Sequence, residues 1–144
     1  MSQIKLALII SDFNQQVTSQ LRQGAINQAQ KQQVEYEVFT VPGAVELPYA
    51  AQCAAKSGHF DAIVMLGCVV RGETGHYDYV CQQVSHGCQQ IMLSYELPVI
   101  FGVLTTENQT QALVRANGEK IDKGAYSVDA AIQMIKLSND PRLQ

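Results

Sequence analysis

Short apolar runs and amphipathic helical segments alternate four times along this chain, and this alternation constrains the fold more than any other feature. The apolar runs are rich in β-branched residues and are typical of buried strands, at residues 5–10, 34–41, 61–66 and 98–104. Segments with helical periodicity lie at residues 15–31, 47–56, after 78, 107–116 and 124–137. Strands separated by helices of this length pair in parallel through right-handed crossovers. The sequence therefore predicts an α/β protein, a three-layer αβα sandwich around a four-stranded parallel sheet.

The size of the chain fits one domain spanning residues 1–144. Its 144 residues, 47% of them hydrophobic, can enclose one core and are too few for two ordinary domains. A flavodoxin-like strand order is the economical arrangement of four parallel strands between two helical layers. Both outer strands would then be exposed edges, which proteins protect. We therefore expect a homo-oligomer.

Charge and hydropathy narrow the class of partner. The net charge is -3 and the lysines and arginines do not cluster, so the positive surface that nucleic acids require is not expected. No apolar stretch approaches the roughly 20 residues of a membrane span, and the first residues lack the pattern of a signal peptide. We expect a cytoplasmic protein that acts on small molecules and has neither a nucleic-acid nor a membrane partner.

The four cysteines do not predict a metal site. They occur without a Cys-x-x-Cys pair and without a histidine at zinc-ligand spacing. Cys53, Cys81 and Cys88 are expected to be small buried apolar groups. The role of Cys68 stays open, because it borders the loop described next but nothing in the sequence marks it as an activated thiolate.

The twelve residues Gly67–Asp78 fall between the third apolar run and the helix expected after it. The carboxyl end of a parallel strand is where α/β sheets bind ligands, and a helix N-terminus there offers free N–H groups to an anion. Arg71 and Thr74 can add a charge and a hydroxyl, and His76 can move a proton near neutral pH. The loop predicts phosphate binding with acid/base chemistry. The alternative is a glycine-rich turn with a solvated histidine.

The loops after the other strands are expected to share the same rim of the sheet. Phe13 has polar neighbours, and it could be a stacking platform for a flat ring or a core residue. Asn14 beside it could cap the next helix or bind a ligand. Glu46 places a carboxylate at a helix start, where it could serve a ligand or simply complement the helix dipole. Phe101 would be ordinary core by the strand pattern alone.

An ordered set of motifs resembles the lumazine synthase family. In chain order they are Phe-Asn at 13–14, Val-Pro-Gly-Ala-x-Glu-x-Pro at 41–48, Gly-x-Val-x-Arg-Gly-x-Thr-x-His-Tyr-Asp at 67–78, Phe-Gly-Val-Leu-Thr-Thr-Glu at 101–107, Gln-Ala and Arg-Ala within 111–116, and Lys-Gly at 123–124. Any one motif is weak, but the ordered set spans essentially the whole chain and is specific. The resemblance implies the same four-stranded parallel sheet flanked by helices.

The resemblance also implies an activity. Members of that family are transferases that join 5-amino-6-(D-ribitylamino)uracil to 3,4-dihydroxy-2-butanone 4-phosphate. The products are phosphate, water and 6,7-dimethyl-8-ribityllumazine, an intermediate of riboflavin biosynthesis. The resemblance implies no metal and no organic cofactor, and it makes riboflavin synthase a candidate partner.

Site residues follow from the same resemblance. It implies that His76 transfers protons. The pyrimidine and its ribityl chain would be held by Phe13, Ala44, Val45, Glu46, Cys68, Val69, Val70 and Phe101. The phosphate would be held by Glu73, Thr74 and Arg115, with Arg71 and Lys123 in support. Arg115 and Lys123, which composition alone would leave as solvated surface charges, match positions that a neighbouring subunit contributes, as does Phe101. The implied active site therefore lies between subunits.

The chain departs from the family pattern at several points. Its N-terminus is shorter than in many members, and residues 118–124 differ from those of shell-forming members, so a homopentamer is favoured over an icosahedral shell. Val45 stands where a larger residue is common, and Tyr126 stands where an acidic residue is common, with Asp129 one turn further on as a substitute. These departures keep open a non-catalytic lumazine- or flavin-binding paralogue. A generic flavodoxin-like phosphate or flavin mononucleotide binder is a third reading.

Overall fold

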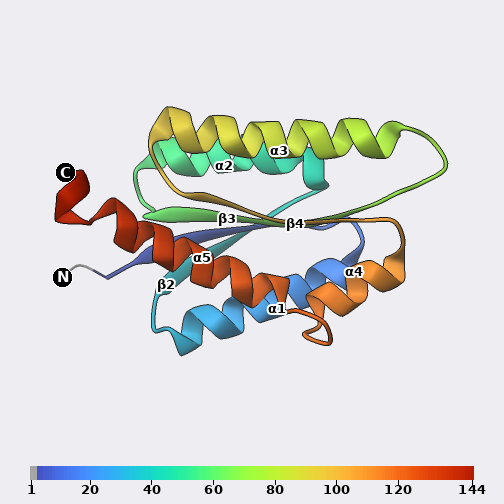
Figure 1. Ribbon diagram of the computed structural model, residues 1–144, viewed down its shortest axis with the longest axis horizontal. Helices are drawn as coiled ribbons and strands as arrows, with labels where there is room; N and C mark the ends of the chain where they lie inside the picture. Colours follow the sequence, from blue (N-terminus) through green and yellow to red (C-terminus); the bar gives the residue numbers. More distant parts are fainter. Residues whose placement is uncertain (1–2) are drawn as a thin grey trace.

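The computed structural model describes residues 3–144, in which a parallel sheet lies between two layers of helices (Figure 1). Its strands are β1 (Lys5–Ser11), β2 (Glu35–Val41), β3 (Ala62–Val70) and β4 (Val99–Thr106). They are ordered β2-β1-β3-β4, and every neighbouring pair is parallel. The predicted α/β class and flavodoxin-like strand order are therefore confirmed.

Two helices cover one face of the sheet and three cover the other (Figure 1). The first layer holds α2 (Leu47–Ser57) and α3 (His76–Tyr95), preceded by the short 3₁₀ helix η1 (Ala44–Glu46). The second layer holds α1 (Gln15–Lys31), α4 (Gln109–Ala116) and α5 (Lys123–Ser138). A last 3₁₀ turn, η2 (Pro141–Leu143), follows α5. The turns after all four strands lie at the same end of the sheet, opposite the start of β1 and the end of α5 (Figure 1).

The side-chain alternation of the strands divides the core between these layers. In β1, Leu6, Leu8 and Ile10 pack toward α1 and α5. Ala7 and Ile9 pack toward α2 and α3. Both faces of a central parallel strand are covered, which explains why the strand sequences read as continuous apolar runs.

The α1 and α5 helices pack closely in the second layer. The predicted inward stripe of α1 is fully buried, from Val17 through Leu21 to Ala25. At the start of α5, Gly124 lies so close to α1 that an added Cβ would overlap the carbonyl oxygen of Leu21. A residue without a side chain is therefore what allows these two helices to approach each other.

The edge strand β2 is much less covered than its neighbours. None of its seven residues is fully buried. Phe39 is 42% exposed, beside a groove lined by Tyr49 of α2 and by Phe60.

Among residues 3–144, no helix is both long and apolar enough to cross a membrane.

Three details differ from the sequence-based prediction. The β3 strand continues to Val70, because Val69 and Val70 pair with the end of β4. The α3 helix begins at His76, so the connecting loop shrinks to residues 71–75. Cys53 is exposed on the outer side of α2 and Cys81 is half-buried, so of the three cysteines expected to be buried only Cys88 is so.

Candidate active site

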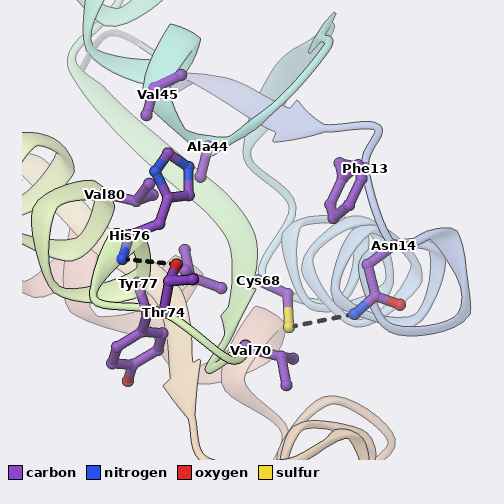
Figure 2. Close-up of a pocket in the computed structure, with 12 residues that line it drawn as sticks. Phe13, Asn14, Ala44, Val45, Cys68, Val70, Thr74, His76, Tyr77 and Val80 are labelled. Atoms are coloured by element: carbon purple, nitrogen blue, oxygen red, sulfur yellow. Dashed lines mark hydrogen bonds between the residues drawn. The ribbon is translucent and has the colours of Figure 1, made fainter.

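A cavity of about 390 Å³ opens at the carboxyl ends of β1 and β3. It is lined by Phe13, Asn14, Ala44, Val45, Cys68, Val69, Val70, Gly72, Thr74, His76, Tyr77 and Val80 (Figure 2). These residues come from the β1–α1 turn, η1, the end of β3, the 71–75 loop and the first turns of α3. The structure therefore brings part of the candidate set together at the rim predicted from the strand order.

The walls of the cavity are mainly apolar, with polar groups at its margins. Ala44 and Val45 come from η1, and Val69 and Val70 end β3. Glu46, also predicted for this site, is exposed at the end of η1 and does not line the cavity. A flat, partly apolar ligand suits such a surface.

His76 is the first residue of α3, and its side chain is exposed on one side of the cavity. Its backbone N–H donates to the Thr74 hydroxyl, with 3.3 Å between nitrogen and oxygen. That contact ties the loop to the helix start, where unpaired N–H groups favour an anion. The imidazole of His76 and the N-terminus of α3 are thus adjacent. Glu73 is exposed in the same loop but does not line the cavity.

Phe13 lies across the cavity from His76 (Figure 2). It is 74% exposed, which excludes the alternative that it is a core residue. An exposed aromatic ring at the mouth of an apolar cavity is available to stack on a planar ligand.

Asn14 holds the turn that carries Phe13. Its backbone is left-handed, with φ of 65°, a conformation that asparagine tolerates better than most residues. Its side-chain amide exchanges two hydrogen bonds with Gln109, at 2.8 and 2.9 Å, and its Nδ2 lies 3.7 Å from the Sγ of Cys68. It makes no side-chain cap on α1. Asn14 is thus the N-cap residue of α1 by its backbone, and its side chain does not cap the helix.

Cys68 is a neutral thiol in this cavity. It is only 5% exposed, and burial raises its pKa to about 11, although the nearby Asn14 amide acts in the opposite direction. A thiol with such a pKa holds its proton near neutral pH and is a poor nucleophile. Cys68 therefore contributes surface to the cavity and no reactive thiolate.

Arg71 does not line the cavity. Its Nε lies 2.8 Å from a carboxylate oxygen of Glu107, and its Nη2 lies 3.3 Å from one of Asp78. The guanidinium also lies over the Tyr77 ring, 4.4 Å from its centroid. The hydrogen bond to Asp78 raises the pKa of Arg71 above its ordinary range. The sequence predicted that the Arg71 guanidinium could bind an anion, but in the structure it is already paired with the carboxylates of Glu107 and Asp78.

Three further candidates lie outside the cavity of the single chain. Phe101 packs against the core on the α2 and α3 side of the sheet. Arg115 donates from Nη1 to the carbonyl of Gln111, at 2.8 Å, within α4. The Lys123 ammonium lies 4.9 Å from the centroid of the Tyr126 ring, on α5. One chain alone does not bring these residues to His76.

The cavity includes Tyr77 and Val80, for which sequence reasoning predicted no role in the site. Val80 is four residues after His76, and helical spacing places such pairs on one face. This spacing predicts that Val80 lines the cavity only when the helix is known to begin at His76. Asp129 accepts a hydrogen bond from Gln28 of α1, at 2.8 Å, and does not line the cavity.

A sequence model of the family described as 6,7-dimethyl-8-ribityllumazine synthase matches residues 3–139. The chain belongs to this family. The 6,7-dimethyl-8-ribityllumazine synthase of Coxiella burnetii is 52% identical over 142 residues, which cover 96% of this chain and 94% of that protein. The protein of the same name from Bdellovibrio bacteriovorus is 44% identical over 141 residues, which cover 97% of this chain and 78% of that protein.

Membership in the lumazine synthase family confirms the resemblance drawn from the ordered motifs. Two of these motifs contribute most of the cavity lining, residues 41–48 and 67–78. Among residues 3–144, no three histidine, cysteine or acidic side chains are grouped so that they could hold a metal ion.

Proposed function

We propose that this chain is a 6,7-dimethyl-8-ribityllumazine synthase of riboflavin biosynthesis, which condenses 5-amino-6-(D-ribitylamino)uracil with 3,4-dihydroxy-2-butanone 4-phosphate. The observation that carries the proposal is the cavity in which an exposed aromatic ring, an apolar wall and a histidine at a helix start meet. The names of the relatives support the same activity.

The pyrimidine ring would stack on Phe13 and lie along the apolar wall. Ala44 and Val45 would hold its edge, with Cys68, Val69 and Val70 beneath it and Glu46 beside the ribityl chain. A ring and a polyol chain bound together explain why the cavity is apolar on one side and polar at its margins.

The phosphate would lie at the start of α3. Thr74 offers a hydroxyl, the Glu73 backbone offers an N–H group, and the helix end adds its positive dipole. Arg115 of a neighbouring subunit would face the phosphate, since a planar guanidinium can bind two of its oxygens.

His76 would move protons at each stage of the reaction. The aromatic amine attacks the ketone and an imine forms with loss of water. Phosphate is then eliminated, and a second amine closes the ring with loss of another water. Each stage moves a proton and none changes the net oxidation state. General acid/base assistance of this kind accelerates reactions by about 10²–10⁴-fold, and orienting two bound reactants supplies much of the rest.

We further propose a homopentamer whose active sites lie between subunits, with Phe101, Arg115 and Lys123 supplied by the neighbour. The support is geometric. The cavity is open at Phe13 and His76, and among residues 3–144 no lysine or arginine side chain lines it. A doubly charged phosphate would need a lysine or arginine side chain to balance its charge.

The first experiment incubates the purified protein with both substrates and follows lumazine absorbance and fluorescence above the uncatalysed reaction. His76→Ala should lower the rate without abolishing it. His86→Ala is the matched control, because His86 is also exposed on α3 but lies outside the cavity. A His76→Ala protein with an unchanged rate would remove the role assigned to the imidazole.

Mixing tests the shared site. His76→Ala and Arg115→Ala proteins, each weakly active, should regain activity after dissociation and reassembly together. No recovery despite verified subunit exchange would mean that each site is built within one chain. Tight binding of lumazine or flavin with no rate above background would instead indicate a binding paralogue.

A further inference from the structure

Arg71 lies next to the cavity, in the loop that carries Thr74, but its guanidinium is directed at protein groups. We propose that Arg71 is a positioning residue: it fastens the 71–75 loop and the first turn of α3 to the segment between β4 and α4. On this proposal, which rests on the proposed function, it does not bind the substrate phosphate.

Contacts with three elements carry the inference. The backbone N–H of Arg71 donates to the carbonyl of Thr106 at the end of β4, at 2.9 Å. Its Nε donates to Glu107, immediately before α4, at 2.8 Å. Its Nη2 donates to Asp78, in the first turn of α3, at 3.3 Å. The Tyr77 ring lies under the guanidinium. One side chain thus joins the end of β3 to both neighbouring segments.

The charge balance argues against direct phosphate binding. One guanidinium faces two carboxylates, Asp78 and Glu107, both more than half exposed. A phosphate brought to this cluster would meet a net negative charge and would have to displace a carboxylate from Arg71. The cavity lining includes Tyr77, beneath Arg71, but not Arg71 itself.

The clamp is expected to act locally. Exposed ion pairs contribute little to global stability, so the fold should survive their loss. The groups held in place are nevertheless His76, two residues before Asp78, and Thr74, three residues after Arg71. Misplacing reacting groups by about 1 Å can cost about 100-fold in rate.

Neutralising the carboxylates of Asp78 and Glu107 distinguishes a clamp from a phosphate ligand. The two roles of Arg71 predict opposite changes in the strength of inhibition by inorganic phosphate. If Arg71 is a clamp, Asp78→Asn, Glu107→Gln and Arg71→Met should each lower kcat by about 10-fold and leave inhibition by inorganic phosphate unchanged or weaker. If Arg71 is a phosphate ligand, Asp78→Asn and Glu107→Gln should free its charge and strengthen phosphate inhibition. That second result would overturn the proposal.

Double variants sharpen the test. Arg71→Met combined with Glu107→Gln should cost little more than Arg71→Met alone, because Arg71→Met already breaks the contact with Glu107. The exchange of charges, Arg71→Glu with Glu107→Arg, should restore part of kcat. Fully additive losses together with no recovery in the exchanged pair would refute a shared contact.

A control and a second readout keep the test independent of catalysis. Arg142→Met breaks a similar exposed arginine–aspartate pair, with Asp140 at 2.7 Å, outside the cavity, and should leave the rate unchanged. Hydrogen exchange of the hydrogen-bonded amides in the first turns of α3, among them Asp78, whose N–H donates to the Gly75 carbonyl at 3.1 Å, should quicken at least about 10-fold in Arg71→Met and not in Arg142→Met. Unchanged exchange would refute the clamp even in a protein that proved to lack synthase activity.

Discussion

Raising the pH from 8 to 10 should destabilise this protein through two buried thiols. Burial raises the pKa of Cys68 and of Cys88 from 9.0 to about 11. Between these two values the unfolded chain loses its thiol protons while the folded chain keeps them. The contribution of the two protonated thiols to the free energy of unfolding is therefore fully present below about pH 9, and it is lost as the pH rises toward 11.

The size of the effect follows from the two shifts. One pKa unit corresponds to about 1.4 kcal/mol, so at pH 10 each thiol should lower the free energy of unfolding by about 1.4 kcal/mol. The two together would remove about 3 kcal/mol at pH 10. A typical domain has about 5–15 kcal/mol in all, so the loss should be easy to measure.

Urea unfolding at pH 8 and pH 10, with a reductant present, would measure the change. The Cys68→Ala/Cys88→Ala protein should lose about 3 kcal/mol less than the original protein between the two pH values, whatever its stability at pH 8. Cys53→Ala is the matched control for the removal of a thiol, because Cys53 is exposed. An equal alkaline loss in the double variant would refute the reasoning from burial.

Three other substitutions test packing and the site. Gly124→Ala should destabilise the fold by about 1–3 kcal/mol in urea unfolding, because its Cβ would overlap the Leu21 carbonyl, whereas Gly75→Ala meets no atom within 4 Å and should change it little. Ser11→Ala should raise stability by about 1 kcal/mol, since Ser11 Oγ is buried with no hydrogen-bond partner among residues 3–144, and a clear loss would show that the hydroxyl is satisfied. Arg115→Ala should raise the KM of the phosphate-bearing substrate more than that of the pyrimidine, and equal changes would contradict a phosphate role.

The layers of the fold could be predicted because their signals are local. The stripe of Val17 and Leu21 on α1 and the continuous apolar run at 61–66 each fall within a few turns or one strand. The extension of β3 to Val70 could not be read from its own sequence, because it depends on pairing with Thr106, far along the chain.

The candidate site likewise has features that the sequence predicted and features that it could not predict. The types of residue at the strand ends predicted a cavity lined by His76 and Phe13, and both residues line the cavity in the structure. Which way a polar side chain turns was not predictable: Asn14 bonds to Gln109, 95 residues away, and Arg71 turns to Glu107. Cys53 was wrongly expected to be buried: the alanines on either side of it in the sequence are buried or half-buried, but Cys53 itself is exposed on α2.

The packing of α1 against α5 bears on how the chain is made. Leu21 and Ala25 are buried beneath a helix that begins at Lys123, about a hundred residues later in synthesis. Domains emerge from the N-terminus onward, so α1 can pack on the sheet early, but the side of α1 that meets α5 stays uncovered until nearly the whole chain exists. The last helix to be made thus completes the layer that the first one began, and a chain cut short before α5 would leave α1 and α4 on that face of the sheet with the place of α5 empty.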